Sequence, residues 1–134
     1  MQLTDDEKKN LLVDEFTSVS PVTCDLTDRL MELKVLMSVR NIRHLPVCDN
    51  GKVVGVLSER DLHALSFNQL EELKAQDMMV TNILTAQRND LLRDVVYAMS
   101  SKKIGSALIT DERNKLYGVF TSTDALNTVV ELLN

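Results

Sequence analysis

The chain has 134 residues, of which 44% are hydrophobic and 26% are charged, and its formal net charge at pH 7 is -5. No apolar run approaches the roughly 18 residues of a membrane-spanning helix, so we expect no membrane insertion. The negative charge, without a basic stretch or an aromatic platform, argues against binding to nucleic acid or to an anionic membrane. The opening MQLTDDEKKN lacks the pattern of a signal peptide, and we therefore expect a cytoplasmic protein.

The first predicted element is a short helix near the start of the chain. Residues 4–7 read Thr-Asp-Asp-Glu, which is the spacing of a capping box. An extended piece then leads to a short strand over 21–23, which enters a helix with Asp25 or Thr27 near its cap. Apolar residues from Leu30 to Met37 recur at helical spacing and mark the buried face of this helix.

A hairpin is predicted next. Apolar strands over 44–48 and 53–57 flank the turn sequence Asp-Asn-Gly at 49–51. Ser58 can then cap a helix that carries Leu62 and Leu65. A connecting helix follows over 67–76, with Ser66 and Gln69 spaced as a capping box.

The second half of the chain repeats this order. A strand over 83–85 enters a helix with Asn89 near its cap, a hairpin has strands over 106–110 and 116–120, and Thr121 can cap the last helix. Residues of the two halves match at an offset of 62 up to the hairpin turn and of 63 after it. The chain is therefore an internal duplication, with one extra residue in the second turn.

Each half reads strand, helix, strand, strand, helix, so the predicted fold class is α/β (α+β) with two tandem β-α-β-β-α repeats and a short N-terminal helix. The predicted divisions are 1–66 for the N-terminal helix and first repeat, 67–76 for the connecting helix, and 77–134 for the second repeat. A lone half of about 60 residues would bury a marginal fraction of its surface. We therefore expect the halves to form one compact domain.

Two short motifs carry the chemistry. GVLSERD runs from Gly55 to Asp61, and GVFTSTD runs from Gly118 to Asp124, each with a hydroxyl followed three residues later by a carboxylate. A carboxylate can accept hydrogen bonds from both ribose hydroxyls, and a hydroxyl beside free amides at a helix start suits a phosphate. The same residues could instead be helix caps that satisfy only their own backbone.

These motifs, with the segments FTSVSPVT, MMVTNILT and IRHLPV, resemble the CBS domain family over about Val13 to Leu133. Two such repeats in tandem form a Bateman module. The resemblance implies a pseudo-twofold pair of repeats whose clefts bind an adenosine-containing regulatory ligand, namely AMP, ADP, ATP or S-adenosylmethionine. It implies no required cofactor.

The resemblance also implies which residues would line the clefts. One cleft would use Thr121, Thr123 and Asp124 with Ser20, Val22, Arg43 and His44. The other would use Ser58, Arg60 and Asp61 with Asn82, Leu84, Gly105 and Ser106. Because an arginine can form bidentate hydrogen bonds to a phosphate, we expect the cleft with Arg43 to be the better site.

No catalytic or metal constellation is evident, since the chain has two histidines, no glycine-rich phosphate loop, and two cysteines without a CxxC spacing. We expect a regulatory module rather than an enzyme, with two reduced cysteines and no bound metal. The alternative is a structural or protein-interaction module without a small ligand. The resemblance also implies a homodimer formed through the helices after each motif, for which the apolar candidates are Leu62, Leu65, Leu126, Val129 and Val130. These could instead belong to the core.

Overall fold

The computed structural model describes residues 2–19 and 22–134. Its contacts divide the chain into two compact units. The central unit spans Val22–Ile83, and the terminal unit combines Leu84–Asn134 with the described residues of Met1–Pro21. The N-terminal segment therefore packs with the second repeat. The boundaries predicted from the sequence follow the repeats and stay a prediction.

The central unit is built on a three-stranded sheet in the order β2-β3-β4. Its strands are β2 (Cys24–Asp25), β3 (His44–Asp49) and β4 (Lys52–Ser58). Strand β2 runs parallel to β3, and β3 is antiparallel to β4. Its helices are α2 (Leu30–Arg40), α3 (Glu59–His63), α4 (Phe67–Glu72) and α5 (Ala75–Met78). Buried residues of α2, β3 and β4 form its core, among them Leu33, Met37 and Leu45.

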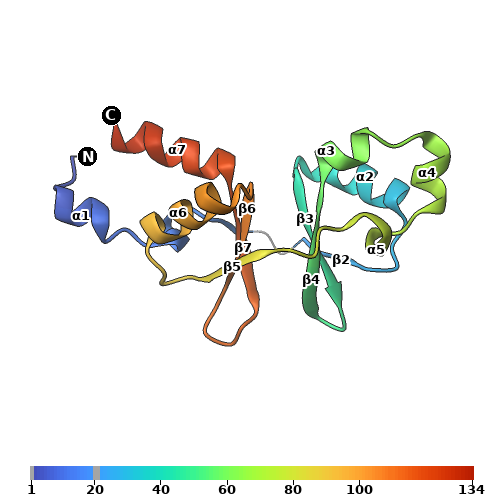
Figure 1. Ribbon diagram of the computed structural model, residues 1–134, viewed down its shortest axis with the longest axis horizontal. Coiled ribbons are helices and arrows are strands. Elements are labelled where there is room, and N and C mark those ends of the chain that lie inside the picture. The colour runs from blue at the N-terminus through green and yellow to red at the C-terminus, as the bar shows by residue number, and fades with distance from the viewer. Residues whose placement is uncertain (1, 20–21) are drawn as a thin grey trace. The chain divides into compact units, whose positions relative to one another are not determined.

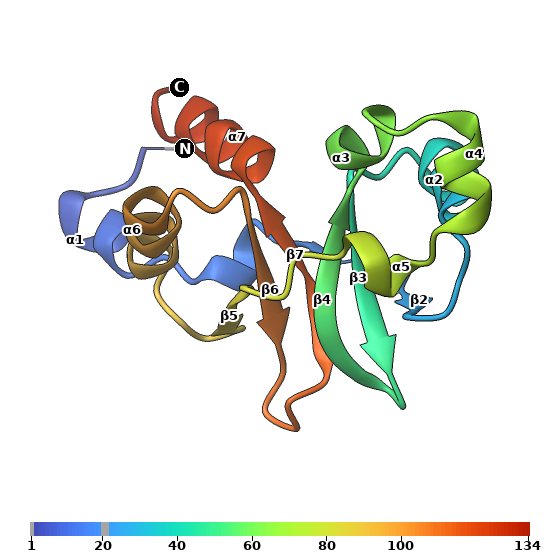
Figure 2. The ribbon, with the colours of Figure 1, turned by 45° about the vertical axis from the view of Figure 1, so that its right-hand side comes forward.

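The terminal unit contains a four-stranded sheet in the order β1-β7-β6-β5. Its strands are β1 (Ser18–Val19), β5 (Leu84–Gln87), β6 (Ser106–Thr110) and β7 (Leu116–Thr121). Its helices are α1 (Asp5–Lys9), the 3-10 turn η1 (Val13–Glu15), α6 (Leu92–Lys102) and α7 (Ser122–Leu132). In Figures 1 and 2, α7 continues from the end of β7 and lies next to α6. Val13 from the N-terminal segment is fully buried in this unit's core with Phe120.

The duplication is visible in the backbone. Helices α2 and α6 each have 11 residues and are followed by C-cap residues with left-handed dihedrals, Asn41 (φ 53°) and Lys103 (φ 55°). Both hairpins contain a register shift, after Val47 and after Ile109. The extra residue of the second repeat lies in the hairpin turn, as predicted. The predicted order of strand, helix, strand, strand, helix is confirmed in both repeats.

The repeat extends further toward the N-terminus than its sequence similarity suggested. Isolated bridges join Leu12 to Leu91 and Arg29 to Lys74, and an offset of 62 relates these two bridges. In both units the preceding segment also caps a helix, since Leu92 N donates to Leu11 O (2.8 Å) and Leu30 N to Leu73 O (3.0 Å). Each repeat is thus completed by the segment that precedes the other repeat.

Local predictions met mixed outcomes. Strand β2 begins at Cys24 rather than within 21–23, and Pro21 lies outside the described residues. The caps of α2 and α6 are Arg29 and Leu91, without a side-chain bond, because backbone carbonyls of the preceding segments satisfy their first amides. The capping box of Ser66 and Gln69 on α4 is confirmed.

Asp25, which was predicted near the cap of α2, is the last residue of β2, and its side chain bonds to the turn that follows. Its Oδ2 accepts hydrogen bonds from the backbone and hydroxyl of Thr27, which lowers the pKa of this carboxyl. None of the helices within the described residues has the length and apolarity that a membrane-spanning helix requires.

Candidate functional site

The motif of the second repeat lies where β7 ends and α7 begins, which we call the Thr121 junction. Thr121 ends the strand in an extended conformation, and its Oγ1 accepts a hydrogen bond from the Asp124 amide (3.2 Å). Asp124 Oδ2 accepts in return from the Thr121 amide (2.8 Å) and from the Thr121 hydroxyl (3.1 Å). The pair is therefore a complete capping box at the start of an 11-residue helix.

The other oxygen of the same carboxylate has a partner that sequence reasoning missed. Ser18 on β1 donates its hydroxyl to Asp124 Oδ1 at 3.1 Å. Strand β1 pairs antiparallel with β7, and the register places Ser18 opposite Val119. The two bonded residues are 106 positions apart, and no local pattern in the sequence marks such a contact.

The motif of the first repeat lies where β4 ends and α3 begins, which we call the Ser58 junction. Ser58 occupies the cap position, but its side chain forms no capping hydrogen bond, so the predicted Ser58 cap is wrong. Asp61 is exposed, and its side chain has no hydrogen bond within the described ranges 2–19 and 22–134. Helix α3 has only five residues, and Arg60 is exposed on it. Glu59 instead contacts His63, with 2.9 Å between Oε1 and Nε2.

The residues at the start of β3 and β6 lie beside the motif of their own repeat. His44 pairs with Ser58 across β3 and β4, and the Glu59 amide donates to the Arg43 carbonyl at 2.9 Å. The sequence-based grouping of Arg43 and His44 with the Thr121 motif concerns a cleft between the repeats, and it stays a prediction. Within the central unit, the structure brings these two residues to the Ser58 junction.

The equivalent arrangement holds in the terminal unit. Ser106 pairs with Thr121 across β6 and β7. The amide and the hydroxyl of Ser122 both donate to the Gly105 carbonyl, at 3.0 Å and 3.2 Å. Gly105 and Ser106, which had been grouped with the Ser58 motif, therefore lie at the Thr121 junction.

The remaining predicted site residues come from the opening segments and the motif tip. Ser20 lies outside the described residues, and Val22 is half-buried at the start of the central unit. Asn82 is exposed, whereas Leu84 is half-buried and pairs with Ala107 at the start of β5 and β6. Thr123 is exposed in the first turn of α7.

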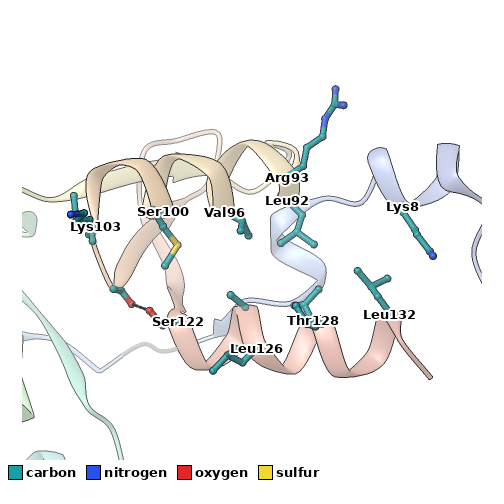
Figure 3. A pocket seen from close by; sticks show the side chains of 15 residues that line it. Lys8, Leu92, Arg93, Val96, Ser100, Lys103, Ser122, Leu126, Thr128 and Leu132 are labelled. Carbon is teal, nitrogen blue, oxygen red and sulfur yellow. Dashed lines mark hydrogen bonds between the residues drawn. The ribbon is translucent and has the colours of Figure 1, made fainter.

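A groove of about 640 Å³ lies in the terminal unit between α6 and α7. Figure 3 shows Lys8 at the end nearer Leu132 and Lys103 at the end nearer Ser122. Aliphatic side chains form most of its wall. Among the described residues, the charged side chains that line it are all cationic, namely Lys8, Arg93 and Lys103. The wall includes Leu92, Val96, Met99, Leu126, Val129 and Leu132.

The apolar residues predicted for a dimer interface differ in their exposure. Leu62 is fully buried in the core of the central unit and cannot contact a partner, so this prediction is wrong. Leu65 is half-buried. Leu126 (67% exposed) and Val130 (61% exposed) remain on the surface of α7, as does Val129.

The two cysteines, Cys24 and Cys48, are both free thiols in the central unit. Burial and the nearby Asp28 carboxylate raise the pKa of the Cys24 thiol to about 12. This thiol is therefore neutral at physiological pH, and it packs as a small apolar side chain.

Comparison with solved structures identifies close matches to the fold. The CBS domain pair of protein MJ0100, solved in complex with 5′-methylthioadenosine and S-adenosyl-L-methionine, is 28% identical with a TM-score of 0.79. That match covers 90% of this chain and 97% of the other. The CBS domain of a bacterial CNNM/CorC family Mg²⁺ transporter has a TM-score of 0.83 and covers 92% of this chain and 78% of the other. Its identity of 19% shows the fold alone.

Comparison with curated sequences gives relatives that are longer than this chain. L-aspartate semialdehyde sulfurtransferase of Methanocaldococcus jannaschii is 30% identical over 115 residues, which is 84% of this chain and 22% of that enzyme. The chain spans from 22% to 49% of the length of three such relatives. The family model of the CBS domain matches twice, at residues 13–67 and 75–131. With a match over each repeat and the same fold in solved CBS pairs, the chain belongs to the CBS domain family as a tandem pair.

Proposed function

We propose that this CBS pair is a regulatory module that binds an adenosine-containing ligand, AMP, ADP, ATP or S-adenosylmethionine, and thereby changes its association with itself or with a protein partner. The observation that carries the proposal is the Asp124 carboxylate, held at the start of α7 on the strand-to-helix junction. The solved CBS pair with two adenosine ligands supports the ligand class. The proposal assigns no catalytic step to the module.

Asp124 retains capacity to accept hydrogen bonds from a ribose diol. Three donors from Thr121 and Ser18 reach its two oxygens, whereas an ionised carboxylate offers about four lone-pair sites. The bonds are also compatible with exchange, because Ser18 and Thr121 hydroxyls can rotate toward other acceptors. Hydrogen bonds to a charged acceptor contribute about 1.5 to 3 kcal/mol each.

The first turn of α7 also suits an anionic group. Of its first three amides, Ser122 N is used by the Gly105 carbonyl and Asp124 N by the Thr121 hydroxyl. The Thr123 amide has no acceptor within the part of the chain that the structure describes. This amide and the positive end of the helix dipole would favour an anionic group nearby, either the alpha-phosphate of a nucleotide or the carboxylate of S-adenosylmethionine.

We propose that the site at this junction uses Thr121, Thr123 and Asp124 with Gly105 and Ser106, because these residues already lie together in the terminal unit. The second site would use Ser58, Arg60 and Asp61 with Arg43 and His44. The opening-segment residues Ser20, Val22, Asn82 and Leu84 stay candidates for holding the adenine.

This regrouping changes which site suits phosphates. The backbones of Arg43 and Arg60 both lie at the Ser58 junction, so guanidinium groups that could bind phosphate bidentately would favour that site. The Thr121 junction instead has the anchored carboxylate for the ribose. The two sites are therefore expected to differ in preference as well as in affinity.

Thermal unfolding with each of the four ligands, followed by calorimetric titration, tests the proposal. A ligand at a hundredfold excess over its dissociation constant stabilises the folded state by about 2.7 kcal/mol. We expect at least one ligand to raise the unfolding temperature and to be recovered unchanged after incubation. No shift with any of them would favour the alternative, a structural or protein-interaction module without a small ligand.

We further propose that the module acts as a homodimer in the cytoplasm and that α7 contributes to the interface. The exposed Leu126 and Val130 side chains support this role, and the free cysteines fit a reducing compartment. Sedimentation velocity of the parent and of Leu126→Glu tests the interface. The expected result is a dimer for the parent and a shift toward monomer for the variant, whereas a monomeric parent would contradict it.

A further inference from the structure

Strand β1 brings a hydroxyl to the carboxylate on which the proposed function depends. Ser18 Oγ donates to Asp124 Oδ1, while Thr121 holds Oδ2 of the same group. The carboxylate is thus held from two sides, by its own helix cap and by a strand that precedes it by more than 100 residues. Neither contact requires a bound ligand.

Gly118 explains why β1 reaches this position. A Cβ atom at residue 118 would overlap the Ser18 carbonyl oxygen and would lie 3.0 Å from Thr17 Cγ2. The absence of a side chain therefore allows β1 to lie closely against β7, in the register that pairs Val19 with Gly118. The preceding residue Thr17 is fixed as well, since its hydroxyl donates to the Val13 carbonyl at 2.7 Å.

The first repeat has the same backbone arrangement without the hydroxyl. Val80 bridges to Val56 through two backbone hydrogen bonds, and the Met79 side chain packs against Gly55. The offset of 62 makes Val80 the counterpart of Ser18. Since the valine side chain cannot donate a hydrogen bond, the Asp61 carboxylate has no equivalent support among the described residues.

We propose that Ser18 is a positioning residue that fixes the Asp124 carboxylate for recognition of a vicinal diol. The inference rests on the proposed function of the Thr121 junction. A carboxylate that is already oriented loses less conformational freedom when a ribose binds, and this increases affinity without a new contact to the ligand. The effect is specific to ligands with a 2′,3′-diol.

Titration of Ser18→Ala with adenosine and with 2′,3′-dideoxyadenosine, monitored by NMR, separates positioning from general support. We expect the dissociation constant for adenosine to rise about fivefold, as expected for loss of roughly one hydrogen bond. The constant for the dideoxy compound should stay unchanged. Ser18→Thr should restore the parent affinity because it keeps the hydroxyl.

Val19→Ala is the matched control, because this exposed neighbour lies on the same strand and its side chain cannot form a hydrogen bond to Asp124. It should bind both nucleosides as the parent does. Equal weakening for both nucleosides in Ser18→Ala, or no weakening, would overturn the positioning role and leave the proposed function intact. A parent that binds neither nucleoside would instead overturn the proposed function, and the inference with it. If Ser18→Ala does not fold, the Ser18→Thr and Ser18→Val pair gives the same comparison.

Discussion

The two strand-to-helix junctions share a backbone and differ in what their side chains do. At the Thr121 junction, Thr121 and Asp124 form a capping box, and Ser18 adds a further hydrogen bond to the Asp124 carboxylate. At the Ser58 junction, Ser58 and Asp61 have the same spacing and form no such bonds. A hydroxyl and a carboxylate three residues apart therefore do not by themselves establish a helix cap.

The helices that follow help to explain the difference. Helix α7 continues for 11 residues, whereas α3 ends at His63, and Ser66 then caps α4. The chain after α3 must turn early because α4, α5 and Val80 pack on the central unit itself. A short helix gains less from a strong cap and has a smaller dipole. The duplicated motif could thus diverge in the first repeat without loss of the fold.

The largest expected effect comes from the two motif glycines. Gly118→Ala places a Cβ against the backbone carbonyl of Ser18, which cannot move without displacing β1, and we expect a loss of about 3 kcal/mol in the free energy of unfolding. Gly55→Ala meets the Met79 side chain, with Sδ at 2.8 Å, and should cost about 1 kcal/mol because that side chain can adapt. Urea unfolding measures both. Equal losses in the free energy of unfolding would show that the close approaches at Gly118 and Gly55 are equally restrictive.

Removal of the two carboxylates compares the junctions as ligand sites. Asp124→Ala should weaken nucleotide binding by about 2 kcal/mol, or roughly thirtyfold, through loss of a charged ribose contact. Asp61→Ala should weaken it less, because that side chain has no hydrogen-bond partner within the described residues. Calorimetric titration gives both constants, and Asp124→Asn separates the charge from the cap. The same affinity in Asp124→Ala and the parent would refute the site assignment.

Removal of the two hydroxyls compares the junctions as helix caps. Thr121→Ala should lower the free energy of unfolding by about 1 kcal/mol, the usual cost of losing an N-cap. Ser58→Ala should change it by less than about 0.5 kcal/mol, because its side chain makes no capping bond. Thermal or urea unfolding is sufficient for both. If Ser58→Ala lowers the free energy of unfolding as much as Thr121→Ala does, the Ser58 side chain caps α3 in solution.

A pH dependence confined to the central unit is absent near neutral pH and develops only under alkaline conditions. Below pH 9.0, the ordinary pKa of the group, the Cys24 thiol is neutral in both the folded and the unfolded chain. As the pH rises from 9.0 toward the folded pKa of about 12, only the unfolded thiol ionises, and stability is progressively lost. The difference in unfolding free energy between the parent and Cys24→Ala should therefore shrink over this range. A constant difference would contradict the raised pKa.

The sequence predicted the repeat, the element order and the family because these depend on local periodicity and on motifs that occur twice. It did not predict that residues 2–19 pack on the second repeat, since their similarity to the segment around Leu73 is too weak to read without the backbone. It also left Leu62 open between an interface and the core, and its full burial became known only from the packing of the central unit.

In the candidate site, too, local features could be predicted from the sequence, whereas contacts between distant strands could not. Thr121, Asp124 and their motif could be selected from sequence, because spacing alone defines them. The Ser18 contact could not, since it depends on how two distant strands pair across Gly118. Gly105 and Arg43 stay candidates, and their hydrogen bonds to Ser122 and Glu59 could not be read from the sequence.

Residue-resolved NMR titration with adenosine tests most directly the claim that the two junctions are unequal. We predict that the amide signals of Ser18 and residues 121–124 shift first, at nucleoside concentrations that leave residues 58–61 unchanged. Shifts at 58–61 that precede or equal those at 121–124 would contradict the claim.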